Sequence, residues 1–179
     1  AELKLIKERE AGISHCPTSN FNLRSGDAPI GLYLDKGIKV GLGTDVSGGF
    51  SPSILEVVKN ASIASKVIAM KNPQPASVDA LENKKFPVAT LLYLATMGGA
   101  EVCNIDEQVG LFAPGKSFDA LRIDIRSNAG NPGLWFPDVQ QMDETVLKGL
   151  LERFLFCGDD RNISEVYVQG RFIGGKLFK

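Results

Sequence analysis

An aspartate framed by glycines is the part of this sequence with the clearest capacity for chemistry. Asp45 lies in the run Val40-Gly41-Leu42-Gly43-Thr44-Asp45-Val46-Ser47-Gly48-Gly49, where a short apolar stretch ends. The carboxyl end of a buried parallel strand is where α/β enzymes place catalytic groups, and a carboxylate can also ligate a metal. The alternative is that Asp45 caps the following segment, as Asp often does. The glycines favour a site because they permit close approach, but spacing alone leaves both interpretations open.

A second candidate is the pair His15-Cys16, because a Cys beside a His could act as a thiolate nucleophile. Adjacent residues in a strand point to opposite faces, so the two side chains would not pair easily. We therefore expect Cys16 to pack in the core and the polar run that follows, residues 17–20, to line the end of the strand.

A third candidate is the run from Gly110 to Ser117, which fits the phosphate-loop pattern letter for letter. A working phosphate loop needs a buried strand before it and a helix after it. Here a polar helix end precedes the run and a strand-like segment follows it, and Pro114 removes one amide that would bind phosphate. The sequence therefore favours a Pro-Gly turn.

The first hundred residues alternate between helical and strand-like segments. We expect helices over 1–10, 29–36 and 53–70, the last with a capping box of Ser53 and Glu56, and strands over 13–16 and 38–42. This α-β-α-β-α order is typical of parallel sheets and barrels. Two strands cannot close a (β/α) barrel, which needs about 200 residues or more. The segment is then either a small open sheet or the last quarter of a barrel.

The remaining residues change pattern. A polar loop over 71–85 leads to two helices that run from Pro87 to about Ile105. From Gly110 the period becomes two, as in strands. We expect a strand over 118–125, turns over 128–137, a helix over 144–154, and a hairpin of strands 163–169 and 172–178.

Composition excludes several classes of function. With 20 basic and 21 acidic residues the net charge is −1 and Lys and Arg do not cluster, so we expect no nucleic-acid or membrane partner. The three cysteines are widely spaced, which argues against a disulfide framework and favours a cytoplasmic protein. No apolar run approaches the ~20 residues of a membrane span. The chain opens with Ala inside a helical pattern, which favours an internal start.

The sequence resembles the guanine deaminases of the amidohydrolase superfamily. The strand-end motifs at 15–20 and 41–45 are shared with many deaminases and chlorohydrolases, whereas the block from Gly158 to Gly170 points to guanine deaminases in particular. The order and spacing extend through all 179 residues. The other matching segments are 23–26, 48–49, 94–100, 114–116 and 118–120.

The resemblance implies a (β/α)₈ barrel with a small β-sandwich built from both chain termini. Residues 1–105 would supply barrel strands seven and eight with their helices, and residues 106–179 would supply the C-terminal share of the sandwich with one helix. The full-length enzyme would be a homodimer that acts in purine catabolism. The isolated piece would expose a sheet edge, which predicts self-association.

The resemblance also assigns chemistry to Asp45. It matches the aspartate of strand eight, which ligates zinc and shuttles protons while an activated water attacks C2 of guanine to give xanthine and ammonia. The other zinc ligands and the substrate contacts of the family lie upstream of this sequence, and His15 matches a wall residue that is not a ligand. We therefore expect the piece alone to be inactive. The alternatives are a deaminase or chlorohydrolase acting on another heterocycle, or a non-catalytic interaction module.

Overall fold

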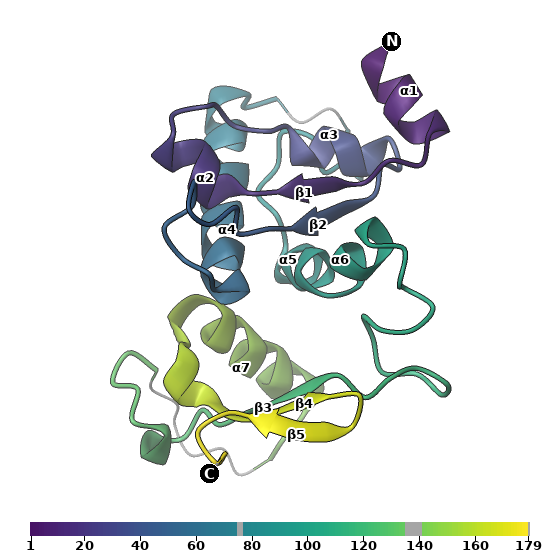
Figure 1. The fold of residues 1–179 in the computed structure, drawn as a ribbon. Helices are drawn as coiled ribbons and strands as arrows, with labels where there is room; N and C mark the ends of the chain where they lie inside the picture. The colour runs from purple at the N-terminus through teal and green to yellow at the C-terminus, as the bar shows by residue number, and fades with distance from the viewer. Residues whose placement is uncertain (75–76, 135–140, 179) are drawn as a thin grey trace. The chain divides into compact units, whose positions relative to one another are not determined.

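The computed structural model describes residues 1–74, 77–134 and 141–178. It divides into two compact units, residues 1–111 and residues 112–179, and each is described by itself (Figure 1). Within the described residues, no helix combines the length and the apolar character needed to cross a bilayer.

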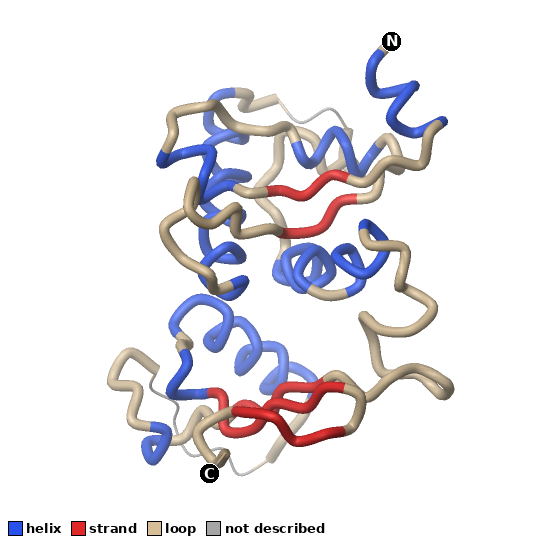
Figure 2. Tube along the Cα trace, in the orientation of Figure 1, coloured by secondary structure: helices blue, strands red, loops and turns tan. Residues whose placement is uncertain are grey.

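The first unit is mixed α/β, as the alternating pattern predicts. Helices and strands lie close to the expected ranges, with the addition of one short helix, α2, that directly follows the first strand (Figure 2). The sequence predicted only a polar strand end there, although Pro17 stands at the first helical position, where proline is favoured. The elements are α1 (Glu2–Glu8), β1 (Ile13–His15), α2 (Pro17–Asn22), α3 (Ile30–Asp35), β2 (Val40–Leu42), α4 (Ile54–Lys71), α5 (Val88–Ala95) and α6 (Met97–Val102).

The two strands of the first unit are parallel, with Ile13 beside Val40 and His15 beside Leu42. Their carboxyl ends therefore lie at one edge of the sheet, from which α2 and the segment after β2 begin (Figure 1). Helix α6 packs directly on β2, because a Cβ atom on Gly41 would lie 2.7 Å from the Cα atom of Gly99. The apolar side chains with at most 1% exposure come from both strand and helices: Ile30, Val40, Val57, Val58, Leu91 and Leu94, with the smaller Ala61.

The start of α4 corrects one expectation. Ser53 is the N-cap residue, but its side chain makes no capping hydrogen bond, so the predicted capping box is wrong. The backbone N–H of Ser53 instead donates to Ser51 Oγ at 3.2 Å. The Glu56 carboxylate instead forms an ion pair with Lys59, one turn further along the helix, at 2.6 Å.

The second unit is a three-stranded antiparallel sheet with one long helix, in the order β3-β4-β5. The predicted hairpin and helix are confirmed, although the strands are shorter than expected. Of the predicted turn region 128–137, residues 135–137 lie outside the described part. Asp143 caps α7 by accepting a hydrogen bond from Val146 N at 2.8 Å. The elements are β3 (Ala120–Ile123), α7 (Glu144–Cys157), β4 (Ile163–Val168) and β5 (Arg171–Gly174), with 3₁₀ turns at Ser127–Ala129 and Asp160–Asn162.

Candidate functional site

The turn that follows β2 carries Asp45 at the carboxyl end of the parallel strands. Pairing of the strands continues past their ends, because Gly43 N donates to His15 O at 2.9 Å. The chain then turns back on itself, and Gly49 N donates to Asp45 O at 2.6 Å. Asp45 adopts a left-handed backbone conformation with φ of +46°, which Asp tolerates better than most residues. The Asp45 side chain is exposed at this edge.

Helix α2 holds this turn through two side chains. Ser19 Oγ donates to Asp45 Oδ2 at 2.5 Å, and Asn22 Nδ2 donates to the carbonyl oxygen of Gly48 at 2.8 Å. The first of these lies at the short end of the range for hydroxyl-to-carboxylate hydrogen bonds, which are stronger than neutral ones. The other carboxylate oxygen, Asp45 Oδ1, takes part in no hydrogen bond within the part of the chain that the structure describes.

The glycines around Asp45 leave room for side chains of the protein itself. A Cβ atom on Gly48 would lie 2.8 Å from Ser19 Oγ and 2.9 Å from Asp45 Oδ2, closer than such contacts occur in proteins. A Cβ atom on Gly43 would likewise lie 2.9 Å from Cys16 Sγ. The close approach inferred from the glycines is therefore real, and it involves side chains of β1 and of the residues that follow it.

His15 and Cys16 do not form a catalytic pair. His15 is only 3% exposed, and neither of its ring nitrogens has a hydrogen-bond partner among the described residues. Burial lowers its pKa from 6.5 to about 4, so the imidazole is neutral at pH 7. Cys16 Sγ lies 3.6 Å from Ser14 Oγ and is half-buried. The expectation that Cys16 is the core residue is thus wrong: the buried side chains here are His15, Pro17, Thr18 and Ser19.

The described residues contain no complete metal site at this edge. No group of three or more His, Cys, Asp or Glu side chains in these ranges could hold a metal ion. Asp45 has the chemistry of a zinc ligand, since one of its oxygens is anchored and the other is not hydrogen-bonded. Any further ligands would have to come from outside the described residues.

The phosphate-loop-like run is a turn, as its flanks predict. The element that follows it is strand β3, which begins at Ala120, so the helix N-terminus that would bind phosphate is missing from this described segment. Gly115 has a φ of +88°, as a tight turn requires.

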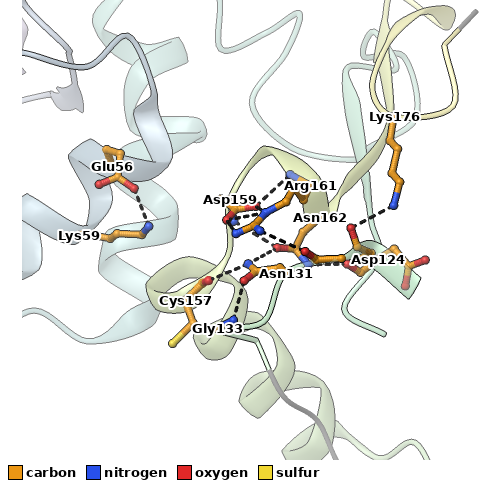
Figure 3. Close-up of polar contacts among 12 residues, drawn as sticks. Glu56, Lys59, Asp124, Asn131, Gly133, Cys157, Asp159, Arg161, Asn162 and Lys176 are labelled. Atoms are coloured by element: carbon orange, nitrogen blue, oxygen red, sulfur yellow. Dashed lines mark hydrogen bonds and ion pairs between the residues drawn. The ribbon is translucent and has the colours of Figure 1, made fainter. Parts of the chain in front are cut away.

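The Gly158–Gly170 block forms a buried hydrogen-bond cluster around Asn162, which is fully buried (Figure 3). Asn162 Oδ1 accepts from Asn131 Nδ2 at 2.8 Å and from Asp159 N at 3.2 Å, while Asn162 Nδ2 donates to Asp124 O at 2.8 Å. Nearby, Arg126 donates two hydrogen bonds to the Asp124 carboxylate, which lowers the pKa of that group to about 2. These groups are paired with one another, so the cluster joins backbone segments of the second unit.

The fold and the sequence define the class of this protein. The chain belongs to the amidohydrolase family, whose model matches residues 1–173. Among curated relatives, it is 41% identical to a probable guanine deaminase of Schizosaccharomyces pombe over 97% of this chain and 31% of the relative. It is 38% identical to a guanine deaminase of Dictyostelium discoideum over 96% of this chain and 35% of the relative.

A solved structure shares both fold and sequence with this chain. The guanine deaminase from C. acetobutylicum with guanine in its active site is 36% identical, with a TM-score of 0.74 over 97% of this chain and 36% of that one. The chain thus spans about a third of the length of the proteins it matches.

Proposed function

We propose that this chain is the C-terminal third of a guanine deaminase, an enzyme that hydrolyses guanine to xanthine and ammonia. The observation that carries the proposal is the Asp45 carboxylate at the carboxyl ends of two parallel strands, with Oδ2 anchored by Ser19 and Oδ1 without a hydrogen bond. In α/β folds this edge is where catalytic groups are placed. The similarity of the whole chain to guanine deaminases supports the choice of substrate.

The proposed architecture follows the resemblance. Strands β1 and β2 would be the last two strands of a (β/α)₈ barrel formed by residues 1–105, and residues 106–179 would complete a β-sandwich. The parallel pairing of β1 with β2 and the antiparallel order β3-β4-β5 support this assignment. We further propose that the full-length enzyme is a cytoplasmic homodimer in purine catabolism and that the isolated piece, with its two-stranded sheet, self-associates.

In the proposed reaction, Asp45 contributes one zinc ligand and moves a proton. Zinc in such sites supplies a nucleophile at neutral pH by acidifying a water molecule. The water oxygen bonds to C2 of guanine, and the bond between C2 and the exocyclic nitrogen breaks. The Asp45 carboxylate accepts a proton from the water and delivers it to the departing amino group, which leaves as ammonia. The remaining ligands and the guanine contacts are proposed to come from residues outside this chain.

The test is an assay of the full-length protein that contains this chain. Guanine should yield equal amounts of xanthine and ammonia, with one zinc per active site. A panel that includes adenine, cytosine and a chlorotriazine separates this proposal from the alternatives: turnover of another heterocycle in preference to guanine would indicate a sister enzyme, and turnover of none would indicate an interaction module. The 179-residue piece assayed alone should be inactive, because it provides one of the required ligands.

A further inference from the structure

The hydroxyl of Ser19 donates its hydrogen bond to the carboxylate of Asp45, the group to which the proposed chemistry is assigned. The Ser19 side chain is 3% exposed, and its Oγ donates to Asp45 Oδ2 at 2.5 Å across 26 residues of sequence. A hydroxyl has a single proton to donate. Ser19 therefore fixes which Asp45 oxygen is anchored and which is left for other partners.

The helix that carries Ser19 is itself held in place. Thr18, which is 1% exposed, accepts a hydrogen bond from Asn60 Nδ2 of α4 at 3.0 Å. Asn22, at the other end of α2, donates to the carbonyl oxygen of Gly48 at 2.8 Å. The Ser19 hydroxyl is therefore presented from a helix tied both to α4 and to the turn, and its position does not depend on its contact with Asp45 alone.

Gly48 indicates that the turn is built around this contact. A side chain at position 48 would begin 2.8 Å from Ser19 Oγ and 2.9 Å from Asp45 Oδ2, and so would push the two groups apart. The hydrogen bond between Ser19 and Asp45 therefore forms only when α2 packs against the turn, and it requires that position 48 carries no side chain.

We propose that Ser19 is a positioning residue for Asp45: by anchoring Oδ2 it would leave Oδ1 oriented to hold zinc. This inference rests on the proposed function. Groups that hydrogen-bond to a metal ligand restrict its orientation, and their loss typically costs 10- to 100-fold in metal affinity or activity. Ser19 does not touch guanine in this scheme, so it acts on turnover and metal binding and leaves substrate binding largely unchanged.

The experiment compares Ser19→Ala with Ser65→Ala in the full-length protein. Ser65 is a matched control because it is 2% exposed and its hydroxyl also makes hydrogen bonds, donating to Ser62 O at 2.8 Å and accepting from Phe86 N at 3.0 Å. We expect Ser19→Ala to lower kcat for guanine, and the affinity for zinc measured by competition with a chelating dye, by about 10- to 100-fold each with KM little changed. Ser65→Ala should leave all three at wild-type values.

Two further variants keep the test decisive. Ser19→Thr retains the hydroxyl and should restore both kcat and zinc affinity. Ser19→Cys preserves the packing but offers only a weak donor, so if Ser19→Ala does not fold, a folded Ser19→Cys enzyme with reduced zinc affinity and kcat supports the proposal. Wild-type zinc affinity and kcat in the folded Ala or Cys variant would overturn it. If the wild-type protein does not convert guanine, the proposed function fails, while the zinc titrations still decide whether Ser19 positions Asp45.

Discussion

The turn around Asp45 and the cluster around Asn162 are both rich in polar groups, but they use them in opposite ways. The Asp45 side chain is exposed, and one of its two oxygens is hydrogen-bonded while the other is not. Asn162 is fully buried, and its side-chain amide uses both its oxygen and its nitrogen within the second unit. The first arrangement leaves one carboxylate oxygen available to bind a ligand. The second gives the buried amide of Asn162 the hydrogen bonds that it would otherwise lose with water.

The resemblance to guanine deaminases assigned different parts to these two regions. The Gly158–Gly170 block was expected to point most narrowly to guanine deaminases, and in the structure it joins backbone segments. The strand-end motif at residues 41–45 is shared more widely and carries the carboxylate. A buried hydrogen-bond network can therefore fix the backbone of a segment without any contact with substrate.

Replacing Asp45 should produce the largest effect and sharpen the contrast. In the full-length protein we expect Asp45→Ala to lower kcat by about 10²- to 10⁴-fold, because the proposed proton carrier is lost. The free energy of unfolding should fall by about 1 to 3 kcal/mol, because the buried Ser19 hydroxyl loses its acceptor. Steady-state assays with guanine and denaturant titrations provide the two readouts. Wild-type activity in a folded Asp45→Ala enzyme would remove Asp45 from the chemistry and restore its interpretation as a structural cap.

Replacing Asn162 should produce the reverse pattern. Asn162→Ala leaves Asn131 Nδ2, Asp159 N and Asp124 O without the side-chain partner they have now, and each loss of this kind costs about 1 to 3 kcal/mol. We expect the free energy of unfolding to fall by about 3 kcal/mol or more in denaturant titrations, with kcat of the remaining folded enzyme retained. The exposed Asn128→Ala is the control and should change stability by less than about 0.5 kcal/mol. A stable Asn162→Ala enzyme with reduced kcat would contradict the distinction between the two regions.

The buried imidazole of His15 should make the stability of the protein depend on pH. Its pKa is about 4 in the folded protein and 6.5 when unfolded, so the unfolded state binds more protons between these values. The contribution of neutral His15 is therefore complete above pH 6.5 and is lost as the pH falls towards 4, by up to about 3 kcal/mol. We expect His15→Gln to flatten the pH dependence of the melting temperature in this window, relative to the wild-type protein. Equal pH profiles for the two proteins would show that His15 is protonated or exposed in solution.

The sequence predicted most of the elements because they are encoded locally. The helical period over residues 53–70 and the alternation around residues 118–125 depend on neighbouring residues, and both elements form. The candidate carboxylate was also identified, through its place after an apolar strand. What could not be predicted is the Ser19–Asp45 contact, because its partners are 26 residues apart and meet only when β1 and β2 pair.

Two errors at the end of β1 have a common physical cause. Cys16 was expected in the core and residues 17–20 were expected to line the end of the strand, with no helix there. In the structure Thr18 and Ser19 are buried, since each has a hydrogen-bond partner from another element that offsets the loss of water. Pro17 was the one local signal for helix α2, because proline at a first helical position is common.

A pair of glycine substitutions gives the smallest and most specific test of the comparison. Gly48→Ala places a methyl group within 2.9 Å of both Ser19 Oγ and Asp45 Oδ2, so these groups must move apart. We expect kcat to fall about tenfold, at the low end of the range for disturbed partners of a metal ligand.

Gly149→Ala in α7 is the matched control, because a Cβ atom there meets nothing within 4 Å and alanine favours the helix by about 0.5 to 1 kcal/mol. Steady-state assays should show a lower kcat for Gly48→Ala and an unchanged kcat for Gly149→Ala. Thermal melts should show a higher melting temperature for Gly149→Ala. If Gly48→Ala retained full activity, the turn could accommodate the methyl group without disturbing Asp45, and the tight packing at this strand end would be unrelated to catalysis.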